Sequence, residues 1–152
     1  MDWLDKAAEN YTKIKKAQEN QKQIIKNYPI KVKELWASFK QMHETIVSKF
    51  GNSTIFTSNP FHMESVIGDV SIRGRAKQAS KAVGYYGSVI ITIEYINSNS
   101  TGIVHFDELL LGDVNGEPTW VYRGIVNGET TDITFDNADI EKVFKSALSI
   151  YL

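Results

Sequence analysis

The residues with the clearest capacity for acid–base or metal chemistry are a histidine and two carboxylates in the second half of the chain. His105 and Asp107 lie two residues apart in a stretch with strand-like alternation, so both side chains are expected on one face of a strand. Glu94 joins them if the segments 87–97 and 102–112 pair. A histidine beside a carboxylate can act as a general base or bind a metal. His105 and Asp107 therefore define a candidate pocket for a small ligand or substrate.

Motifs of the common enzyme classes are absent from the sequence. The three histidines, His43, His62 and His105, do not have a metal-ligand spacing such as HExxH. There is no GxSxG nucleophile elbow, P-loop or GxGxxG motif, and there is no cysteine. The sequence therefore favours a protein with no catalytic residues, no cofactor and no metal, and it leaves enzyme activity open.

Charge is divided unevenly along the chain. The 152 residues carry a net charge of -1, but residues 1–81 hold fourteen basic and eight acidic side chains, a net charge of +6. Residues 82–152 hold three basic and ten acidic side chains, a net charge of -7. Two arrangements explain this division: basic helices lie against an acidic sheet, or one charged pole attracts a partner of opposite charge.

The acidic pole combines carboxylates with aromatic and arginine side chains: Asp107, Glu108, Asp113, Glu117, Trp120, Tyr122 and Arg123. Aromatic residues and arginine are typical of binding hot spots between proteins. Our leading prediction is a non-enzymatic protein-binding module, a small bacterial or phage inhibitor or immunity-type protein, whose acidic sheet surface covers a basic partner protein. The alternative for Trp120 and Tyr122 is that they share a buried face of the sheet, because they lie two residues apart.

A basic segment is the alternative binding site. It carries Arg73, Arg75, Lys77 and Lys81, and we expect it to form a loop just before Tyr85. Cationic side chains near aromatic rings can hold phosphates or stack on bases. No recognised nucleic-acid-binding motif accompanies them, so the sequence argues against a nucleic-acid partner.

The first fifty residues have the pattern of amphipathic helix. Apolar side chains recur at spacings of three and four: Leu4, Ala7, Tyr11, Ile14, Ile25, Tyr28, Val32, Leu35, Phe39, Met42 and Ile46. Gln18, Gln21 and Lys49 interrupt this stripe, but its spacing continues across Pro29. Because proline lacks an N–H and disfavours helical geometry at the residue before it, Pro29 predicts a helical hairpin of residues 3–27 and 30–50. One kinked helix is the alternative. It would be about 70 Å long, would project from the protein and would need a partner. An oligomeric scaffold joined through residues 1–50 is therefore a further functional alternative.

The apolar period changes to two between residues 54 and 135, which predicts a sheet. Strands are expected near 64–72 and then in a meander that ends in a tight hairpin at Asn127 and Gly128. Residues 137–150 have a helical apolar stripe, and Asp136 suits its N-cap. We therefore expect one α+β domain over residues 1–152. The helical hairpin would pack on a mainly antiparallel sheet of five or six strands, followed by the C-terminal helix.

The composition is that of a globular domain, with 42% hydrophobic and 23% charged residues. The sequence does not begin with a basic stretch followed by an apolar one, and its apolar runs are far shorter than the ~20 residues of a membrane span. We therefore expect a cytoplasmic protein with no membrane partner.

Overall fold

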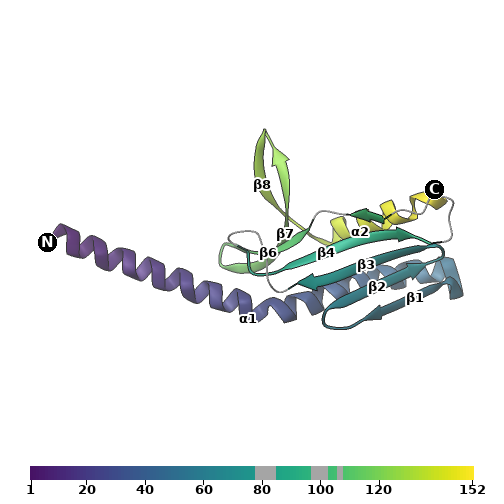
Figure 1. Cartoon of the computed structure of the whole chain (residues 1–152), viewed down its shortest axis with the longest axis horizontal. Coiled ribbons are helices and arrows are strands. Elements are labelled where there is room, and N and C mark those ends of the chain that lie inside the picture. The colour runs from purple at the N-terminus through teal and green to yellow at the C-terminus, as the bar shows by residue number, and fades with distance from the viewer. Residues whose placement is uncertain (78–84, 97–102, 106–107) are drawn as a thin grey trace.

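One helix of 49 residues, α1 (Asp2–Phe50), dominates the computed structural model, which describes residues 1–77, 85–96, 103–105 and 108–152 (Figure 1). The predicted helical hairpin is therefore wrong, because α1 continues through Pro29. The apolar spacing of three and four continues on both sides of Pro29, so the chain can stay helical and keep one apolar stripe. The axis of α1 bends where its projecting part meets the part on the sheet (Figure 1). Proline inside a helix is a known cause of such bends.

Eight strands follow in the described part of the chain, after a short 3-10 turn, η1 (Gly51–Ser53): β1 (Thr54–Ser58), β2 (His62–Ile67), β3 (Val70–Lys77), β4 (Ser88–Tyr95), β5 (Ile103–His105), β6 (Leu109–Val114), β7 (Glu117–Val126) and β8 (Glu129–Thr134). Seven of them form one antiparallel path in the order β1-β2-β3-β4-β6-β7-β8, and β5 pairs with β4 beside this path. The mainly antiparallel sheet is confirmed, but it has more strands than the predicted five or six.

Two tight hairpins end the sheet. The β7–β8 turn at Asn127 and Gly128 has φ angles of 52° and 81°, and the β6–β7 turn at Asn115 and Gly116 has 54° and 81°. Positive φ at both turn residues is the type I′ geometry, which asparagine and glycine accept at low cost. The expected Asn–Gly hairpin is thus confirmed. The β7–β8 hairpin rises away from the rest of the sheet (Figure 1).

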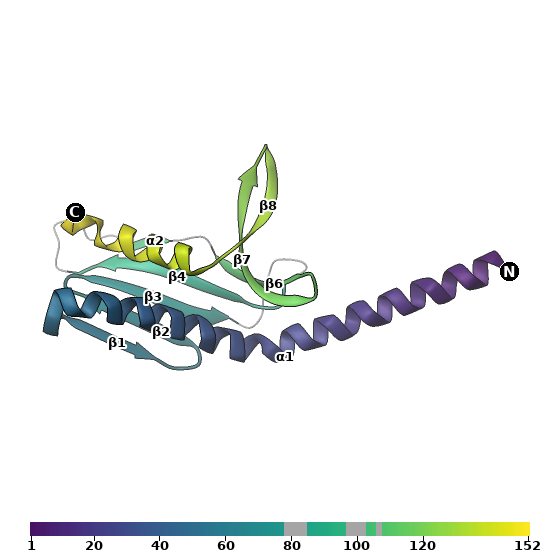
Figure 2. The ribbon, with the colours of Figure 1, turned by 180° about the vertical axis from the view of Figure 1, so that it is seen from behind.

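Two helices cover one face of the sheet: the second half of α1 and α2 (Asn137–Ala147), seen together from behind in Figure 2. The Asp136 carboxylate accepts a hydrogen bond from the Asp139 backbone N–H at 3.2 Å, and the Asp139 carboxylate accepts one from the Asp136 N–H at 3.0 Å. This capping box confirms Asp136 as the N-cap and starts α2 at the predicted place. A final 3-10 turn, η2 (Leu148–Tyr151), follows α2.

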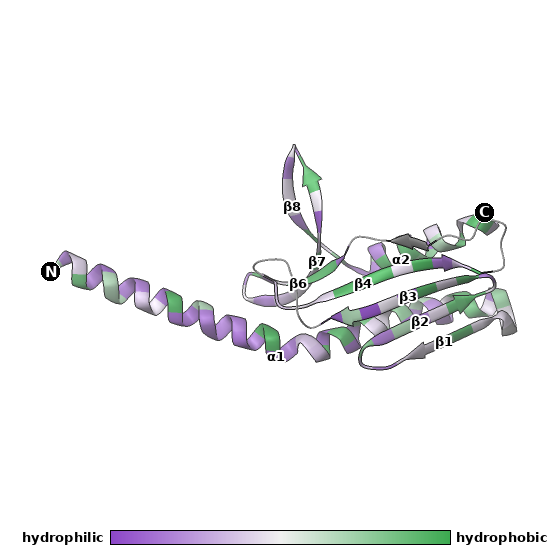
Figure 3. Cartoon of the chain, viewed as in Figure 1, coloured by the Kyte–Doolittle hydropathy of each residue, from purple (hydrophilic) through white to green (hydrophobic). Residues whose placement is uncertain are grey.

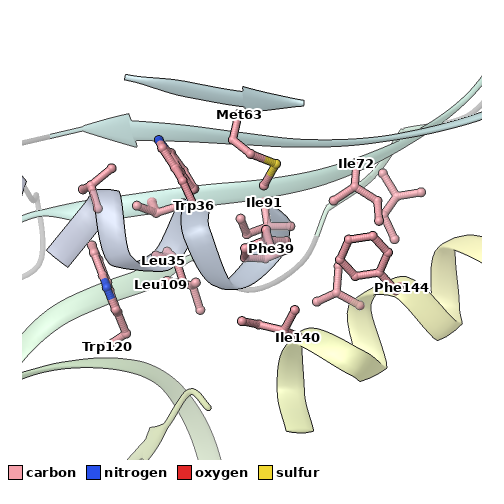
Figure 4. Close-up of a cluster of buried hydrophobic side chains, with 14 of the residues drawn as sticks. Leu35, Trp36, Phe39, Met63, Ile72, Ile91, Leu109, Trp120, Ile140 and Phe144 are labelled. Atoms are coloured by element: carbon pink, nitrogen blue, oxygen red, sulfur yellow. The ribbon is translucent and has the colours of Figure 1, made fainter. Parts of the chain in front are cut away.

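The hydrophobic core lies between these helices and the sheet (Figure 4). Leu35, Trp36 and Phe39 of α1 and Phe144 of α2 are at most 5% exposed. They meet buried side chains of the strands: Met63, Ile67, Val70, Ile72, Val89, Ile91, Ile93, Leu109, Leu111 and Trp120. We call this side of the sheet the covered face. The opposite side of β2, β3 and β4 is the open face.

Hydrogen bonds from aromatic side chains fix the second half of α1 on the sheet. The Tyr28 hydroxyl donates to the Ser88 carbonyl at 2.9 Å, and Trp36 Nε1 donates to the Asn59 carbonyl at 3.1 Å. In the reverse direction, Trp120 Nε1 of β7 donates to the Lys31 carbonyl at 3.2 Å. Burial raises the pKa of Tyr28 to about 12, so its hydroxyl keeps the proton that it donates. Residues 24–50 are therefore part of the globular body.

Candidate functional site

The first half of α1 is the most exposed element of the protein, and we call residues 2–23 the helical arm. Every residue of the arm is exposed except Asn20, which is half-buried, and Ile24 is the first buried residue at 1% exposure. Figure 1 shows the arm extending clear of the sheet. At 1.5 Å per residue it is about 33 Å long.

Large apolar side chains lie on this arm in water. Trp3 is 68% exposed, Leu4 50%, Tyr11 63% and Ile14 58%. Figure 3 shows a few hydrophobic segments along the mostly hydrophilic arm. Isolated exposed apolar residues are normal on protein surfaces, but a set in regular order marks an interaction surface.

The apolar residues of the arm follow the spacing of a heptad repeat. Leu4, Ala7, Tyr11 and Ile14 are separated by three and four residues, so they lie along one side of the helix. Gln18 and Gln21 continue the same spacing in the second half of the arm, and Ile25 and Tyr28 continue it into the body. Beyond Tyr28, the same positions hold Val32, Leu35 and Phe39, which pack on the sheet. The stripe therefore continues along α1 with polar residues at Gln18 and Gln21; it is exposed up to Ile25, which is 47% exposed, and is buried at Tyr28, Val32, Leu35 and Phe39.

Local contacts give the arm little support of its own. Glu9 and Lys13 form an exposed ion pair at 3.3 Å, and the Lys15 ammonium lies 5.8 Å from the centre of the Tyr11 ring. Pairs of this kind stabilise a helix by about 0.2–0.5 kcal/mol each. An isolated helix of about this length is only marginally stable in water, so most helices depend on packing of an apolar face.

The open face carries the predicted basic residues, in a strand and not in a loop. Arg73, Arg75 and Lys77 belong to β3, which corrects the expected loop, and Lys81 lies outside the described residues. Arg73 lies between two carboxylates, with its Nε 2.7 Å from Glu64 and its Nη1 2.9 Å from Glu94. The single strand expected near 64–72 is also wrong: β2 ends at Ile67 and, after a turn at Gly68 and Asp69, β3 begins at Val70. Alternate residues of β3 point to the two faces of the sheet, so its exposed side is charged and its covered side is not.

An open hollow of about 720 Å³ lies on this part of the sheet. His62 and Arg75 face each other across β2 and β3, and Thr57, Ile90 and Thr92 line the hollow with them. Among the described residues Arg75 forms no salt bridge, in contrast to Arg73. An arginine beside hydroxyl groups is suited to a carboxylate or phosphate ligand. Ligand binding by Arg73, Arg75 and Lys77 stays a prediction.

The residues predicted for the acidic partner surface do not form one surface. Trp120 is 7% exposed and packs edge-on against Tyr28 at 6.1 Å, and half-buried Tyr122 packs against Phe135 at 6.5 Å. Trp120 is therefore in the core and not on a partner surface, whereas Tyr122, on the same side of β7, is only half-buried and its predicted contact with a partner stays a prediction. Arg123 points to the other face, because it is the next residue in β7.

The carboxylates of this predicted surface remain exposed. Glu108, Asp113 and Glu117 are accessible to solvent, whereas Asp107 lies outside the described residues. Asp113 also accepts a hydrogen bond from the Gly116 N–H at 2.6 Å, so it stabilises the β6–β7 turn. Glu108 precedes the first residue of β6, whereas Asp113 and Glu117 lie at the β6–β7 turn at the other end of this strand, so the exposed carboxylates do not surround an aromatic centre.

Arg123 belongs to a cluster that the sequence analysis missed. The Tyr85 hydroxyl donates to both carboxylate oxygens of Asp132, at 2.5 and 2.7 Å, and the Arg123 guanidinium lies 4.9 Å from the centre of the Tyr85 ring. Burial and the hydrogen bond to Asp132 raise the pKa of Tyr85. The β7–β8 register places Arg123 opposite Asp132. The two-residue Asn–Gly turn was a sequence signal that could have shown this pairing.

The predicted ligand pocket cannot be assembled from the described residues. The backbone of His105 pairs with Thr92 through β5 and β4, and Asp107 lies outside the described residues. The other two histidines lie apart, with His62 on the open face and His43 buried in α1. The described part of the chain holds no group of three or more histidine, aspartate or glutamate side chains that could bind a metal.

His43 is a buried histidine that is expected to make the stability of the protein sensitive to acid. Its Nδ1 lies 2.6 Å from the Ser65 hydroxyl, and the side chain is only 3% exposed. Burial lowers the pKa of His43 below its usual value of 6.5. Below pH 6.5 the unfolded chain therefore binds a proton that the folded chain resists, and the free energy of unfolding decreases as the pH falls.

Urea unfolding between pH 7.5 and 5 measures this effect. We expect H43Q, whose side chain does not titrate, to lose less stability over this range than the wild type. H62Q removes an exposed histidine and is the matched control, with a profile expected to follow the wild type. Equal slopes in H43Q and the wild type would show that His43 does not cause the acid sensitivity.

Comparisons with protein-family models, with curated proteins and with solved structures found no match. A search of the described residues for membrane-spanning helices found none of sufficient length and apolar character. The functional proposal for this chain therefore depends on its own geometry.

Proposed function

We propose that this chain is a self-associating interaction module in which the helical arm joins two copies of the protein. It corresponds to the oligomeric scaffold considered from the sequence. One observation carries the proposal: a single apolar stripe is covered by the sheet in the second half of α1 and is left in water in the first half.

The length and pattern of the arm suit a coiled coil. From Leu4 to Ile25 the heptad spacing extends over three repeats, with apolar residues at five of the seven positions and glutamine at Gln18 and Gln21. Pairing with a second helix would remove Leu4, Tyr11 and Ile14 from water. Apolar area removed from water contributes about 25 cal/mol per Å², which adds to the weak local support of the arm.

The other functions considered from the sequence have less support. A binder that covers a basic protein keeps exposed carboxylates at Glu108, Asp113 and Glu117, but its aromatic centre, Trp120, is in the core. A ligand pocket or enzyme site built on His105 and Asp107 falls on residues that are incompletely described. We therefore place the interaction site on the arm.

Light scattering after gel filtration tests the proposal on the full chain. We expect a mass of twice the 17.2 kDa of one chain at micromolar concentrations and above. The variant Y11E/I14E places two carboxylates in the apolar stripe. It should weaken association by at least about 100-fold, because burying an unpaired charge costs several kcal/mol and each 1.4 kcal/mol is tenfold in affinity.

A matched variant controls for the added charge. T12E/Q23E also adds two carboxylates to the arm, on other sides of the helix, and should remain dimeric. Circular dichroism and thermal unfolding of both variants show whether the body is intact. A monomeric wild-type chain throughout the concentration range would contradict the proposed function.

A further inference from the structure

The arm also indicates how the two copies are arranged. We propose that the arm of one chain pairs with the arm of a second copy in antiparallel orientation, with the two bodies at opposite ends of the pair. The inference rests on the proposed self-association and specifies the partner surface and its direction. Three features carry it: the place where the sheet begins to cover α1, the lengths that fit together, and the distribution of charge.

The position of the sheet argues against a parallel pair of α1 helices. In a parallel pair in register, the second helix would continue along the stripe from the arm past Tyr28. That part of the stripe is occupied, because Tyr28 donates a hydrogen bond to Ser88 of β4 and packs against Trp120 of β7. The second α1 carries a sheet at the same place, so both bodies would compete for the same side of the two helices. An antiparallel pair separates the bodies.

One antiparallel register uses the whole arm without a clash. It places Leu4 opposite Gln21 of the second copy, Ala7 opposite Gln18, and Tyr11 opposite Ile14. In this register residue 1 of one chain reaches the level of residue 24 of the other. Ile24 is the first residue buried by the body, so the overlap ends where the body begins. Sliding the helices by a further heptad would place Leu4 opposite Tyr28, which the sheet already covers.

The centre and the ends of this pairing differ in character. Tyr11 and Ile14 meet in the middle, where an aromatic ring packs on a branched aliphatic side chain. Gln18 and Gln21 lie opposite Ala7 and Leu4 of the second copy, so each polar side chain has an apolar partner and no glutamine faces its own copy. A glutamine gains no hydrogen bond from an apolar side chain, so the Tyr11–Ile14 layers at the centre, and not the ends, hold the two arms together.

Charge favours the same orientation. Residues 2–12 of the arm hold three carboxylates and one lysine, a net charge of -2: Asp2, Asp5, Glu9 and Lys6. Residues 13–23 hold four lysines and one carboxylate, a net charge of +3: Lys13, Lys15, Lys16, Lys22 and Glu19. An antiparallel pair places the acidic half of each arm beside the basic half of the other, and a parallel pair places like charges together. Opposite charges at an interface select the partner and its orientation.

The lysines that flank the stripe are also compatible with the antiparallel register. Lys15 and Lys22 lie next to the stripe, and in this register they come beside Ala8 and residue 1 of the second copy, and not beside each other. Their aliphatic stems can cover the apolar layer while the ammonium groups stay in water. Raising the salt concentration should weaken the dimer, because charge attraction between exposed groups is screened.

Cysteine cross-linking tests the orientation directly, and the chain offers a clean background because it has no cysteine. The variants are L4C and Q21C, each made in the full chain. Within one helix these positions are about 26 Å apart, too far for a disulfide, which needs Cα atoms within about 7 Å. A disulfide between them therefore forms only between chains.

We expect a covalent dimer when L4C and Q21C are mixed and oxidised by air, and none when either variant is oxidised alone. D5C replaces L4C as the control, because Asp5 lies beside the stripe and should not cross-link with Q21C. A disulfide in L4C alone would overturn the antiparallel arrangement in favour of a parallel one. A dimer by light scattering that forms no L4C–Q21C disulfide would overturn the register and leave the proposed self-association standing. A monomer by light scattering would contradict both.

Discussion

Replacing Phe39 with alanine is expected to lower the free energy of unfolding by about 3–5 kcal/mol, the range for a phenylalanine removed from a well-packed core. Phe39 is 0% exposed and lies at the point where α1, α2 and the sheet meet (Figure 4). Its ring lies 6.0 Å from that of Phe144, tilted by 40°. Removing the ring leaves a cavity between α1, α2 and the sheet. The packed side chains around the cavity prevent the neighbouring elements from moving in to fill it.

Urea unfolding at one fixed protein concentration measures this loss. The concentration must be fixed because association of the folded chain adds to its apparent stability. K40A changes the next residue of α1, which is exposed, and is expected to alter the free energy of unfolding by no more than about 0.5 kcal/mol. A loss below about 1 kcal/mol in F39A would show that α1 is not held on the sheet through this core.

Replacing Pro29 with alanine is expected to raise the free energy of unfolding, by about 1–3 kcal/mol. Proline inside a helix lacks the N–H that would bond to the carbonyl four residues earlier, and its ring crowds that carbonyl, at a cost of about 3 kcal/mol relative to alanine. The observed bend relieves part of this crowding, so the gain is smaller than the full value. Pro29 itself is exposed, and α1 continues on both sides of it.

The same substitution should straighten α1. Because Figure 1 shows the arm clear of the sheet, it can change direction without losing contacts in the body. Denaturation curves of P29A and of K33A, an exposed helical position nearby, separate a proline effect from a general gain in helix propensity. Lower stability in P29A would mean that the bend is required for residues 30–50 to dock on the sheet.

Local pattern was sufficient to predict several elements of this fold. The type I′ turn at Asn127, the N-cap at Asp136 and the C-terminal helix depend on residues close together in sequence, and all three are present. Most strands of the meander were also recognisable, because alternate apolar residues line the covered face. The segment 102–112, expected to be one strand, instead contains β5 and the first part of β6, which both pair with β4.

The sequence pattern could not predict whether residues 1–50 form one helix or two, because Pro29 is compatible with both structures. A proline can end a helix, or it can bend one whose neighbouring turns are stable enough to continue. Here Tyr28 and Val32 pack on the sheet on both sides of the proline and hold the helix in place. That choice depends on contacts with strands more than fifty residues away, which no local pattern contains.

The candidate site was predictable only as one alternative among several. The heptad stripe of residues 1–50 was visible in sequence, but its exposed part could not be separated from its buried part. Trp120 illustrates the reverse problem, because the same pair of aromatic residues is compatible with a binding surface and with a core. Burial distinguishes them: Trp120 is 7% exposed and Trp3 is 68% exposed.

The most direct test of arm pairing is a distance between the two copies of Lys26, measured by pulsed electron paramagnetic resonance on a spin-labelled K26C variant of the full chain. Lys26 is exposed and lies between the arm and Pro29. With Leu4 opposite Gln21, the two copies of residue 26 are offset by about 27 helical residues, which corresponds to about 40 Å. We expect a distance distribution centred near that value. Two results would contradict the antiparallel pairing of the arms. One is a short distance that reflects only the separation of two adjacent helix axes, about 8–10 Å. The other is the absence of any dipolar coupling at concentrations up to the millimolar range.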